Sequence, residues 1–249
     1  MKKLPKAPLK EVIFELRWDL EVDDKTQQEY DKGYELAQGK FQSLIKNKFK
    51  FYTRNLPREI PEHLLNYKTV HQFWLKENTW PVLQLGPGIF TMNDTDKNYV
   101  WEDTFFPLIQ SYLKLLFKAY ENKININFCN LKYIDAVKIN DYPDKNNILN
   151  FVKNNLKIKL EHCFDINGIL ENININQTFK LKDRSLLNIV IANGTDKNTK
   201  EPMLIWQTAV FKKTVFKNNE ILKWCKNAHS IISPLFKKMT KGDFYDSFK

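Results

Sequence analysis

Apolar and polar side chains alternate along residues 11–18, near the start of the chain. One parity is apolar throughout: Val12, Phe14, Leu16 and Trp18. The other parity is mainly charged: Glu11, Ile13, Glu15 and Arg17. Successive side chains of a strand point to opposite faces, so this pattern predicts a strand whose first set packs beneath helices while the second set lies on the other face.

The next hundred residues predict a helix, three strands and a second helix. Apolar residues recur three and four positions apart over residues 26–49, which is typical of an amphipathic helix. Two prolines predict a loop over residues 54–61. Strand patterns follow at residues 70–76, 80–85 and 88–92. Gly86-Pro87-Gly88 predicts a tight bend before the last of these strands, and an amphipathic helix over residues 101–120 completes the order β-α-β-β-β-α.

The same order then begins again. A strand is predicted at residues 126–139 and a helix at 148–160. Three strands follow at residues 169–182, 186–192 and 203–216. Residues 193–198 lie between the last two strands and predict a hairpin loop, whose Asn193-Gly194 step accepts positive φ. A helix over residues 219–239 closes the second half.

The repeated order predicts the fold class. We expect a two-layer α+β fold, with an antiparallel-rich curved sheet and helices on one face. Residues 1–122 and 123–249 form its tandem β-α-β-β-β-α halves, and the two halves together make one continuous domain. Such an arrangement is similar to the TATA-box-binding-protein and helix-grip folds. Each closing helix carries a tryptophan near its start, Trp101 and Trp224, and we expect both in the core.

Composition limits the class of protein further. Hydrophobic residues make up 43% of the 249 and aromatic residues 14%, which is far too much apolar surface for a disordered chain. The apolar runs are too short to span a bilayer, and no signal peptide is expected, so the prediction is a cytoplasmic protein. The three cysteines are widely spaced and include no C-x-x-C pair, which predicts buried or idle thiols in a reducing compartment. We expect neither a metal site nor a cofactor.

A net charge of +10 raises the possibility of nucleic-acid binding. Only four of the 39 basic residues are arginines, however, whereas arginine is the usual choice for bidentate phosphate and base contacts. Lysine and asparagine are abundant throughout the chain, as coding DNA rich in A and T would produce. Genome composition therefore explains the charge at least as well as a binding site does.

Six polar residues are candidates for a groove or an interface. Glu11, Glu15 and Arg17 share one face of the first strand, where they could form either a surface ion pair or a polar pair inside a groove. Tyr133 and Asp135 share a face with apolar residues of the predicted strand 126–139, so Asp135 is expected to be buried and to need partners or a shifted pKa. His229 lies on the apolar flank of the closing helix, which favours a satisfied, half-buried imidazole.

Two motifs and a shorter match carry a family resemblance. They are the opening run APLKEVIFELRW (residues 7–18), the central LGPGIFTMND (residues 85–94) with Tyr99 and Trp101 after it, and LKYID at residues 131–135. Together they resemble a sporadically distributed family of prokaryotic proteins of about this length, over nearly the whole chain, and Ala228-His229 in the closing helix is also similar. The family has no established activity. Its sporadic distribution implies mobile or defence-linked gene neighbourhoods.

Three functional hypotheses remain open. The first is a non-enzymatic binding or regulatory protein, such as a sensor or accessory subunit of a host-defence or toxin-related locus, whose partner is another protein or a second copy of the chain. The second is a sequence-tolerant nucleic-acid binder, which uses aromatic residues interleaved with lysine at residues 49–52 and 212–217. The third is an enzyme whose site assembles from Glu15, Arg17, Asp135 and His229.

Overall fold

The computed structural model describes residues 4–95, 97–145, 147–164, 166–168, 170–196 and 198–249. The fold is α+β, as predicted, with a nine-stranded sheet in the order β4-β5-β6-β7-β1-β8-β11-β10-β9 and a two-stranded ribbon, β2-β3. Through the first closing helix the elements are β1 (Leu9–Trp18), β2 (Glu21–Val22), β3 (Glu29–Tyr30), α1 (Tyr34–Ile45), β4 (Phe51–Arg54), η1 (Glu62–Leu65), β5 (His71–Trp74), β6 (Val82–Gly86), β7 (Ile89–Asp94), η2 (Trp101–Phe105) and α2 (Phe106–Ala119). The remaining elements are β8 (Ile126–Lys138), η3 (Ile139–Asp141), α3 (Ile148–Leu156), β9 (Asn174–Lys180), β10 (Leu186–Thr195), β11 (Pro202–Lys213), α4 (Asn218–Met239) and α5 (Asp243–Asp246).

The chain divides into two compact units, and each is assembled from separate stretches of sequence. The α1 unit comprises Glu11–Leu131 and Phe211–Lys226. The α3 unit comprises Met1–Lys10, Lys132–Val210 and Asn227–Lys249. The division into tandem halves at residue 122 stays a prediction. No helix in the described residues is both long enough and apolar enough to cross a membrane.

In the α1 unit, antiparallel pairing links β4, β5, β6, β7 and β1 in succession. The register creates transverse rows of side chains that alternate between the two faces of the strands. One row is apolar and contains Phe73, Leu83, Met92 and Phe14. The next row is polar and contains Thr53, Gln72, Gln84, Thr91 and Glu15. We call the side of the apolar row the helix face and the side of the polar row the polar face.

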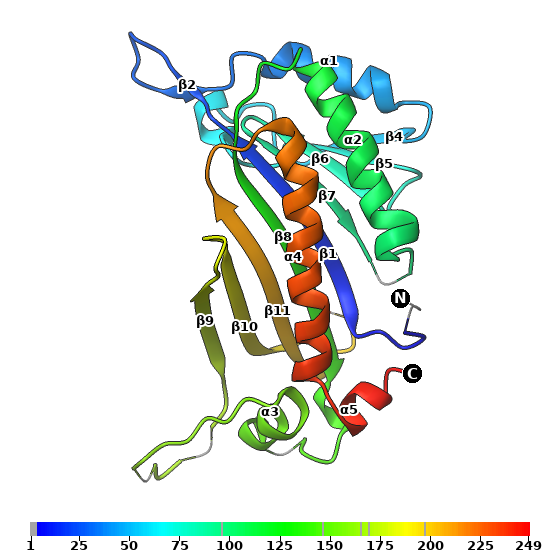
Figure 1. Ribbon diagram of the computed structural model, residues 1–249, viewed down its shortest axis with the longest axis vertical. Coiled ribbons are helices and arrows are strands. Elements are labelled where there is room, and N and C mark those ends of the chain that lie inside the picture. Colours follow the sequence, from blue (N-terminus) through cyan, green and yellow to red (C-terminus); the bar gives the residue numbers. More distant parts are fainter. Residues whose placement is uncertain (1–3, 96, 146, 165, 169, 197) are drawn as a thin grey trace. The chain divides into compact units, whose positions relative to one another are not determined.

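Helices α1 and α2 lie on the same side of these strands (Figure 1). The Phe41 ring of α1 contacts Phe73 at 5.8 Å and Phe90 at 5.7 Å between centroids, in edge-on geometry. Phe90 is the register partner of Leu16 in β1. The apolar parity of β1 is buried to 1% exposure or less at Val12, Phe14, Leu16 and Trp18. The predicted burial of this parity is therefore confirmed.

The region between β1 and β5 differs from the prediction in two places. Residues 26–33 do not belong to a helix, because the chain first makes the β2-β3 ribbon and α1 begins only at Tyr34. Asp31 follows the last residue of this ribbon, and its backbone carbonyl accepts the Tyr34 N–H at 3.0 Å. Strand β4 was not predicted, and its four residues pair with β5, so the first half has four strands after α1. Such a short strand carries too little periodicity to be separated from the proline-rich loop that follows it.

The predicted bend at residues 86–88 is confirmed as the turn between β6 and β7. Gly88 has φ +72°, a conformation that glycine adopts without strain. At Gly86, a Cβ would lie 1.8 Å from the carbonyl oxygen of Lys68, so the neighbouring backbone leaves no room for a side chain. Both glycines are therefore required by the backbone, as expected of a structural turn.

In the second half the element order β8, α3, β9, β10, β11, α4 matches the prediction. Strand β9 begins at Asn174, later than predicted, and residue 169 lies outside the described residues. The predicted loop does lie between two neighbouring strands, β10 and β11, but its start is wrong, because β10 continues through Gly194 to Thr195 and the positive φ falls on Lys200. The side chain of Asp196 organises the turn by accepting the N–H groups of Asn198 at 2.8 Å and Thr199 at 2.9 Å.

Both tryptophans that were expected in the core are buried. Trp101 is 7% exposed and its ring lies 5.3 Å from that of Phe106. Trp224 is 6% exposed and contacts the ring of Phe216 at 6.0 Å. Both lie in the α1 unit, so each indole contributes to the same hydrophobic core.

We expect Trp101→Ala and Trp224→Ala each to lower the free energy of unfolding by about 3 to 5 kcal/mol, because truncating a buried indole removes a large apolar contact area. Urea denaturation of the two variants measures this loss. Phe179→Ala is the control, since Phe179 is 46% exposed and its truncation should cost about 0.5 kcal/mol or less. Wild-type stability in both tryptophan variants would show that neither indole supports the core.

Candidate functional site

The charged parity of β1 forms a polar cluster on the polar face, made of two hydrogen-bonded groups: Glu15 with Arg17 and Asn130, and Glu11 with Asn93. Nε of Arg17 donates to Oε1 of Glu15 at 2.6 Å. The Glu15 side chain is 12% exposed and that of Arg17 is 40% exposed, so the pair is partly removed from water. The sequence pattern predicted that Glu11, Glu15 and Arg17 share one face of the strand. In the structure, Glu15 and Arg17 are bonded directly to each other.

Two aromatic rings flank the guanidinium of Arg17. Its Cζ lies 5.0 Å from the ring centroid of Phe128 and 5.7 Å from that of Tyr67. Phe128 comes from β8, and its ring lies 6.1 Å from that of Phe211 in β11. A cation over an aromatic face is attracted by the ring quadrupole, so these rings hold the guanidinium in place without a second carboxylate.

Two asparagines extend the cluster on either side of Glu15. Nδ2 of Asn93 donates to Oε1 of Glu11 at 2.7 Å, and Nδ2 of Asn130 approaches Oε2 of Glu15 at 3.4 Å. In both pairs the amide nitrogen faces the carboxylate, and this sets the orientation of the asparagine side chain. The amide oxygens of Asn93 and Asn130 and the hydroxyl of Thr91 are buried and have no hydrogen-bond partner in the described chain.

Tyr133, Asp135 and His229 belong to the α3 unit. The Tyr133 hydroxyl and Nδ1 of His229 share a hydrogen bond of 2.9 Å. Burial lowers the pKa of His229 to about 4, so the imidazole is neutral near pH 7. His229 is thus half-buried and hydrogen-bonded, as the apolar flank of its helix predicted.

Asp135 is buried at 4% exposure, as predicted. No hydrogen bond or ion pair reaches its carboxyl from the residues that the structure describes. Burial raises the pKa of Asp135 to about 7, and the charge of Lys10 opposes this shift only in part. The pKa is thus raised, as expected of a carboxyl without a bonded partner.

The residues of the enzymatic hypothesis fall in different units. Glu15 and Arg17 lie in the α1 unit, whereas Asp135 and His229 lie in the α3 unit. Within the described chain, no group of three histidine, cysteine or acidic residues could hold a metal ion. Of the thiols, Cys129 and Cys225 are buried and Cys163 is exposed. Burial raises the pKa of Cys225 well above its ordinary value, which disfavours the reactive thiolate.

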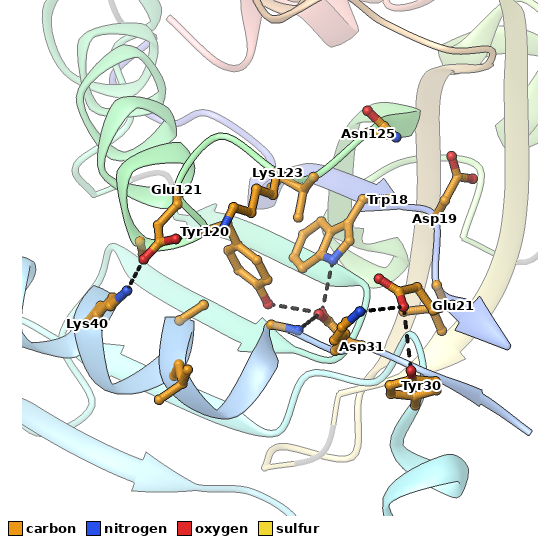
Figure 2. Close-up of a pocket in the computed structure, with 17 residues that line it drawn as sticks. Trp18, Asp19, Glu21, Tyr30, Asp31, Lys40, Tyr120, Glu121, Lys123 and Asn125 are labelled. Carbon is orange, nitrogen blue, oxygen red and sulfur yellow. Dashed lines mark hydrogen bonds and ion pairs between the residues drawn. The ribbon is translucent and has the colours of Figure 1, made fainter. Parts of the chain in front are cut away.

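A cavity of about 490 Å³ opens in the α1 unit, between the end of β1, the start of α1 and the end of α2. Figure 2 shows the Trp18 indole and the Tyr120 hydroxyl converging on the carboxylate of Asp31. The two rings meet edge to face at 5.1 Å. Apolar side chains from the segment after β1, from α1, from the end of α2 and from the segment after α2 also line the wall: Leu20, Leu36, Ala37, Ala119 and Ile124.

Ion pairs surround the mouth of this cavity. Glu121 accepts from Lys40 at 2.5 Å and from Lys123 at 2.8 Å. Hydrogen bonds from these two lysines lower the pKa of Glu121 to about 2. Lys32 lies 3.4 Å from Glu21, which also accepts the Tyr30 hydroxyl. Each lysine that lines the cavity therefore has a carboxylate partner.

Sequence reasoning missed this cavity. Its floor residue, Asp31, falls inside the segment that the pattern assigned to a helix, and Trp18 was expected only to fill the core. The one local signal is an aspartate three residues before the start of α1. Aspartate is common near helix starts, so that signal by itself indicates a cap and not a binding site.

Asp135→Asn tests the buried carboxyl. With a folded pKa raised to about 7 and an unfolded value near 4, only the folded state holds the proton in between, so this group makes stability fall as pH rises from about 4 to 7. The variant removes that loss. We expect the free energy of unfolding of the variant, relative to wild type, to rise across this window and level off above it, by about 4 kcal/mol at most.

Urea denaturation at pH 4, 5, 6, 7 and 8 measures this difference. Subtracting the wild-type curve removes the contributions of other groups, such as the histidines. Asp103→Asn is the control, because Asp103 is exposed on η2. A difference between Asp135→Asn and wild type that does not change with pH would contradict the assignment of a buried, protonated carboxyl.

Comparison of the chain with family models, curated proteins and solved structures finds no match. Two features of the structure therefore bear on function, the polar cluster and the cavity. The polar cluster contains three of the six candidate residues from the sequence, Glu11, Glu15 and Arg17. The cavity lining contains none of the six.

Proposed function

We propose that this chain is a non-enzymatic binding protein that recognises a partner protein through the polar face of the α1 unit. The observation that carries this proposal is the clamped Arg17 side chain. It is bonded to Glu15 at 2.6 Å and lies over the rings of Phe128 and Tyr67, yet its side chain remains 40% exposed. An arginine whose conformation is already fixed loses little entropy when a partner contacts it.

The composition of the polar face also favours protein recognition. The face positions of β1, β5, β6 and β7 carry no lysine, although lysine is abundant elsewhere in the chain. They carry one of the four arginines, and aromatic residues lie at both ends: Tyr67 and Phe128 beside Arg17, and Trp74 on β5. Protein interfaces are enriched in arginine and aromatic residues and depleted of lysine.

The unpartnered amide oxygens support a role beyond folding. A buried polar group without a hydrogen bond costs about 1 to 3 kcal/mol, and native proteins contain few of them. Two amide oxygens and one hydroxyl of this kind lie on the polar face, at Asn93, Asn130 and Thr91. Apolar side chains at these positions would avoid that cost. These groups lie next to Glu11 and Glu15, so the polar face of β1 retains polar groups that the core does not require.

The nucleic-acid hypothesis has weaker support. Two of its aromatic residues belong to the core: Phe49 is 3% exposed and packs against Tyr112, and Phe216 is 7% exposed and packs against Trp224. On the polar face, a phosphate that approached Arg17 would also meet the carboxylate of Glu15, which is bonded to Arg17 at 2.6 Å. Repulsion by this carboxylate opposes the electrostatic attraction that drives binding to a phosphate backbone.

The finer fold proposal is an internal duplication. The strand order is symmetric about β1 and β8: β7, β6, β5 and β4 follow β1 outward, and β11, β10 and β9 follow β8 outward. Each half places a helix after its first strand and another helix after its last. This symmetry supports tandem halves related to the TATA-box-binding-protein or helix-grip arrangement, which is an analogy of fold and implies no function.

The proposed biological setting rests on the sequence resemblance. The motifs at residues 7–18 and 85–94 include Glu11, Glu15, Arg17, Asn93 and the turn that places Asn93 opposite β1. The resembled family suggests an accessory or sensor subunit of a prokaryotic host-defence or toxin-related locus. The partner would then be another protein of that locus or a second copy of the chain.

Site-specific photo-crosslinking in the host cell tests the proposal. A photoreactive residue at Gln84, which is half-buried on the polar face, should give one protein adduct, whereas the same residue at Lys114, exposed on α2, should not. Arg17→Ala should reduce the adduct about tenfold, as loss of a central interface arginine does, while Arg58→Ala, an exposed arginine of the same unit, leaves it unchanged.

The mass of the adduct distinguishes the occupants. A mass of twice the chain identifies a second copy, and another discrete protein mass identifies a different partner. An adduct to nucleic acid at Gln84, or a protein adduct indifferent to Arg17→Ala, contradicts the proposal.

A further inference from the structure

The carboxylate of Asp31 is buried at the floor of the cavity without a cationic partner. It is 8% exposed, and no lysine, arginine or histidine of the described chain forms an ion pair with it. Its bonds come from neutral donors only. Oδ2 accepts the Trp18 indole N–H at 2.9 Å, the Tyr120 hydroxyl at 3.0 Å and the Gly88 backbone N–H at 3.0 Å.

The second oxygen of Asp31 retains bonding capacity. Oδ1 accepts a single bond, from the backbone N–H of Gly33 at 3.2 Å. Oδ2 accepts three bonds and Oδ1 accepts one, so Oδ1 is the oxygen with room for a further donor. Burial, and then the charge of Asp31, raise the pKa of Tyr120 above its ordinary value, so its hydroxyl stays protonated and remains a donor. The neutral donors stabilise the carboxylate by hydrogen bonding but supply no positive charge.

The other charges at the cavity do not neutralise Asp31. Lys32 is paired with Glu21, and Lys40 and Lys123 are both paired with Glu121. Asp19 accepts a hydrogen bond from Asn127 at 2.6 Å. Three lysines and four carboxylates line the cavity, which gives a formal sum of −1 in a chain whose net charge is +10. The cavity is therefore a local site of negative charge on a basic protein.

The walls of the cavity suit an organic cation. The side chains of Trp18, Tyr120 and Tyr30 line the cavity (Figure 2), although the first two are almost fully buried, at 1% and 5% exposure. Aromatic faces attract ammonium groups, most strongly when both are shielded from water. Leu20, Leu36 and Ile124 supply apolar surface for the rest of a ligand. A volume of about 490 Å³ lies within the range of small-molecule sites.

An anionic ligand fits these observations poorly. Its charge would face Asp31, and the three lysines would have to leave their carboxylates to reach it. A neutral ligand would leave the buried charge without compensation. A protonated amine, by contrast, supplies both an N–H donor for Oδ1 and the missing positive charge.

We propose that the cavity formed by Trp18, Asp31 and Tyr120 binds the ammonium group of a small apolar amine. The site is separate from the polar face and does not depend on the function proposed for it. A ligand there contacts the end of β1, the start of α1 and the end of α2 together.

Three ligands of matched size test the proposal on the full chain: 2-phenylethylamine, 2-phenylethanol and 3-phenylpropionate. Calorimetry or ligand-observed NMR at low ionic strength and pH 7 gives their relative affinities. We expect the amine to bind about tenfold more tightly than the alcohol, and the carboxylate most weakly. The proposal is overturned if the carboxylate binds best, if the three bind equally, or if the amine does not bind at millimolar concentration.

A charge pair at the cavity mouth separates binding from folding. Leu36 is 74% exposed, so Leu36→Lys and Leu36→Glu should leave the fold intact. Leu36→Lys should weaken amine binding several-fold, because a positive charge at the cavity mouth repels the ammonium group. Leu36→Glu should strengthen binding, because a negative charge there attracts it. Leu64→Lys and Leu64→Glu are matched controls, because Leu64 is 51% exposed on η1 and does not line the cavity. The reverse order at Leu36, or equal effects at both positions, overturns the proposal.

Discussion

The alternation of side chains along β1 is the constraint on which the rest of the α1 unit depends. A strand cannot turn one residue to the other face without shifting its register, so the positions of Phe14 and Leu16 in the core also decide where Glu15 and Arg17 lie. The register with β7 carries this division across the neighbouring strands. Phe14 meets Met92 on the helix face, and Glu15 meets Thr91 on the polar face.

The same strand also builds the cavity. Trp18 is the last residue of β1 and belongs to the buried parity, and a buried indole N–H usually bonds an acceptor. Asp31 supplies that acceptor and at the same time bonds Tyr120 and the turn at Gly88. Because Asp31 accepts these bonds, its negative charge lies between β1, α1 and α2. The proposed amine site is a consequence of that placement.

The sequence predicted those parts of the fold whose cause is local. The alternation in β1 and the turn at Gly88 depend on side-chain parity and on backbone conformation, which neighbouring residues determine. The predicted start of the first helix was too early, because apolar residues at helical spacing continue back into the β2-β3 ribbon. The predicted start of the loop at residues 193–198 was wrong because Asn193 serves a distant partner, as its Oδ1 accepts the N–H of Ile173 at 2.7 Å.

The candidate site divides in the same way. Glu11, Glu15 and Arg17 were found from strand parity alone, and their polar character on one face is correct. Asn93, Asn130 and the two rings beside Arg17 could not be found, because each is brought to β1 by strand pairing or by a loop. Asp31 was hidden for another reason: its donors are 13, 57 and 89 residues away in sequence, apart from Gly33.

We propose that β1 separates a face that stabilises the fold from a face that serves recognition. The most direct measurement is the free energy of unfolding of the double variant Glu15→Val/Arg17→Val, by urea denaturation beside the wild type. Replacing a partly buried ion pair with apolar, strand-favouring residues is often neutral or stabilising. We therefore expect the free energy of unfolding of the double variant to equal or exceed that of the wild type. A loss of more than about 2 kcal/mol would contradict it, because the pair would then hold the sheet together.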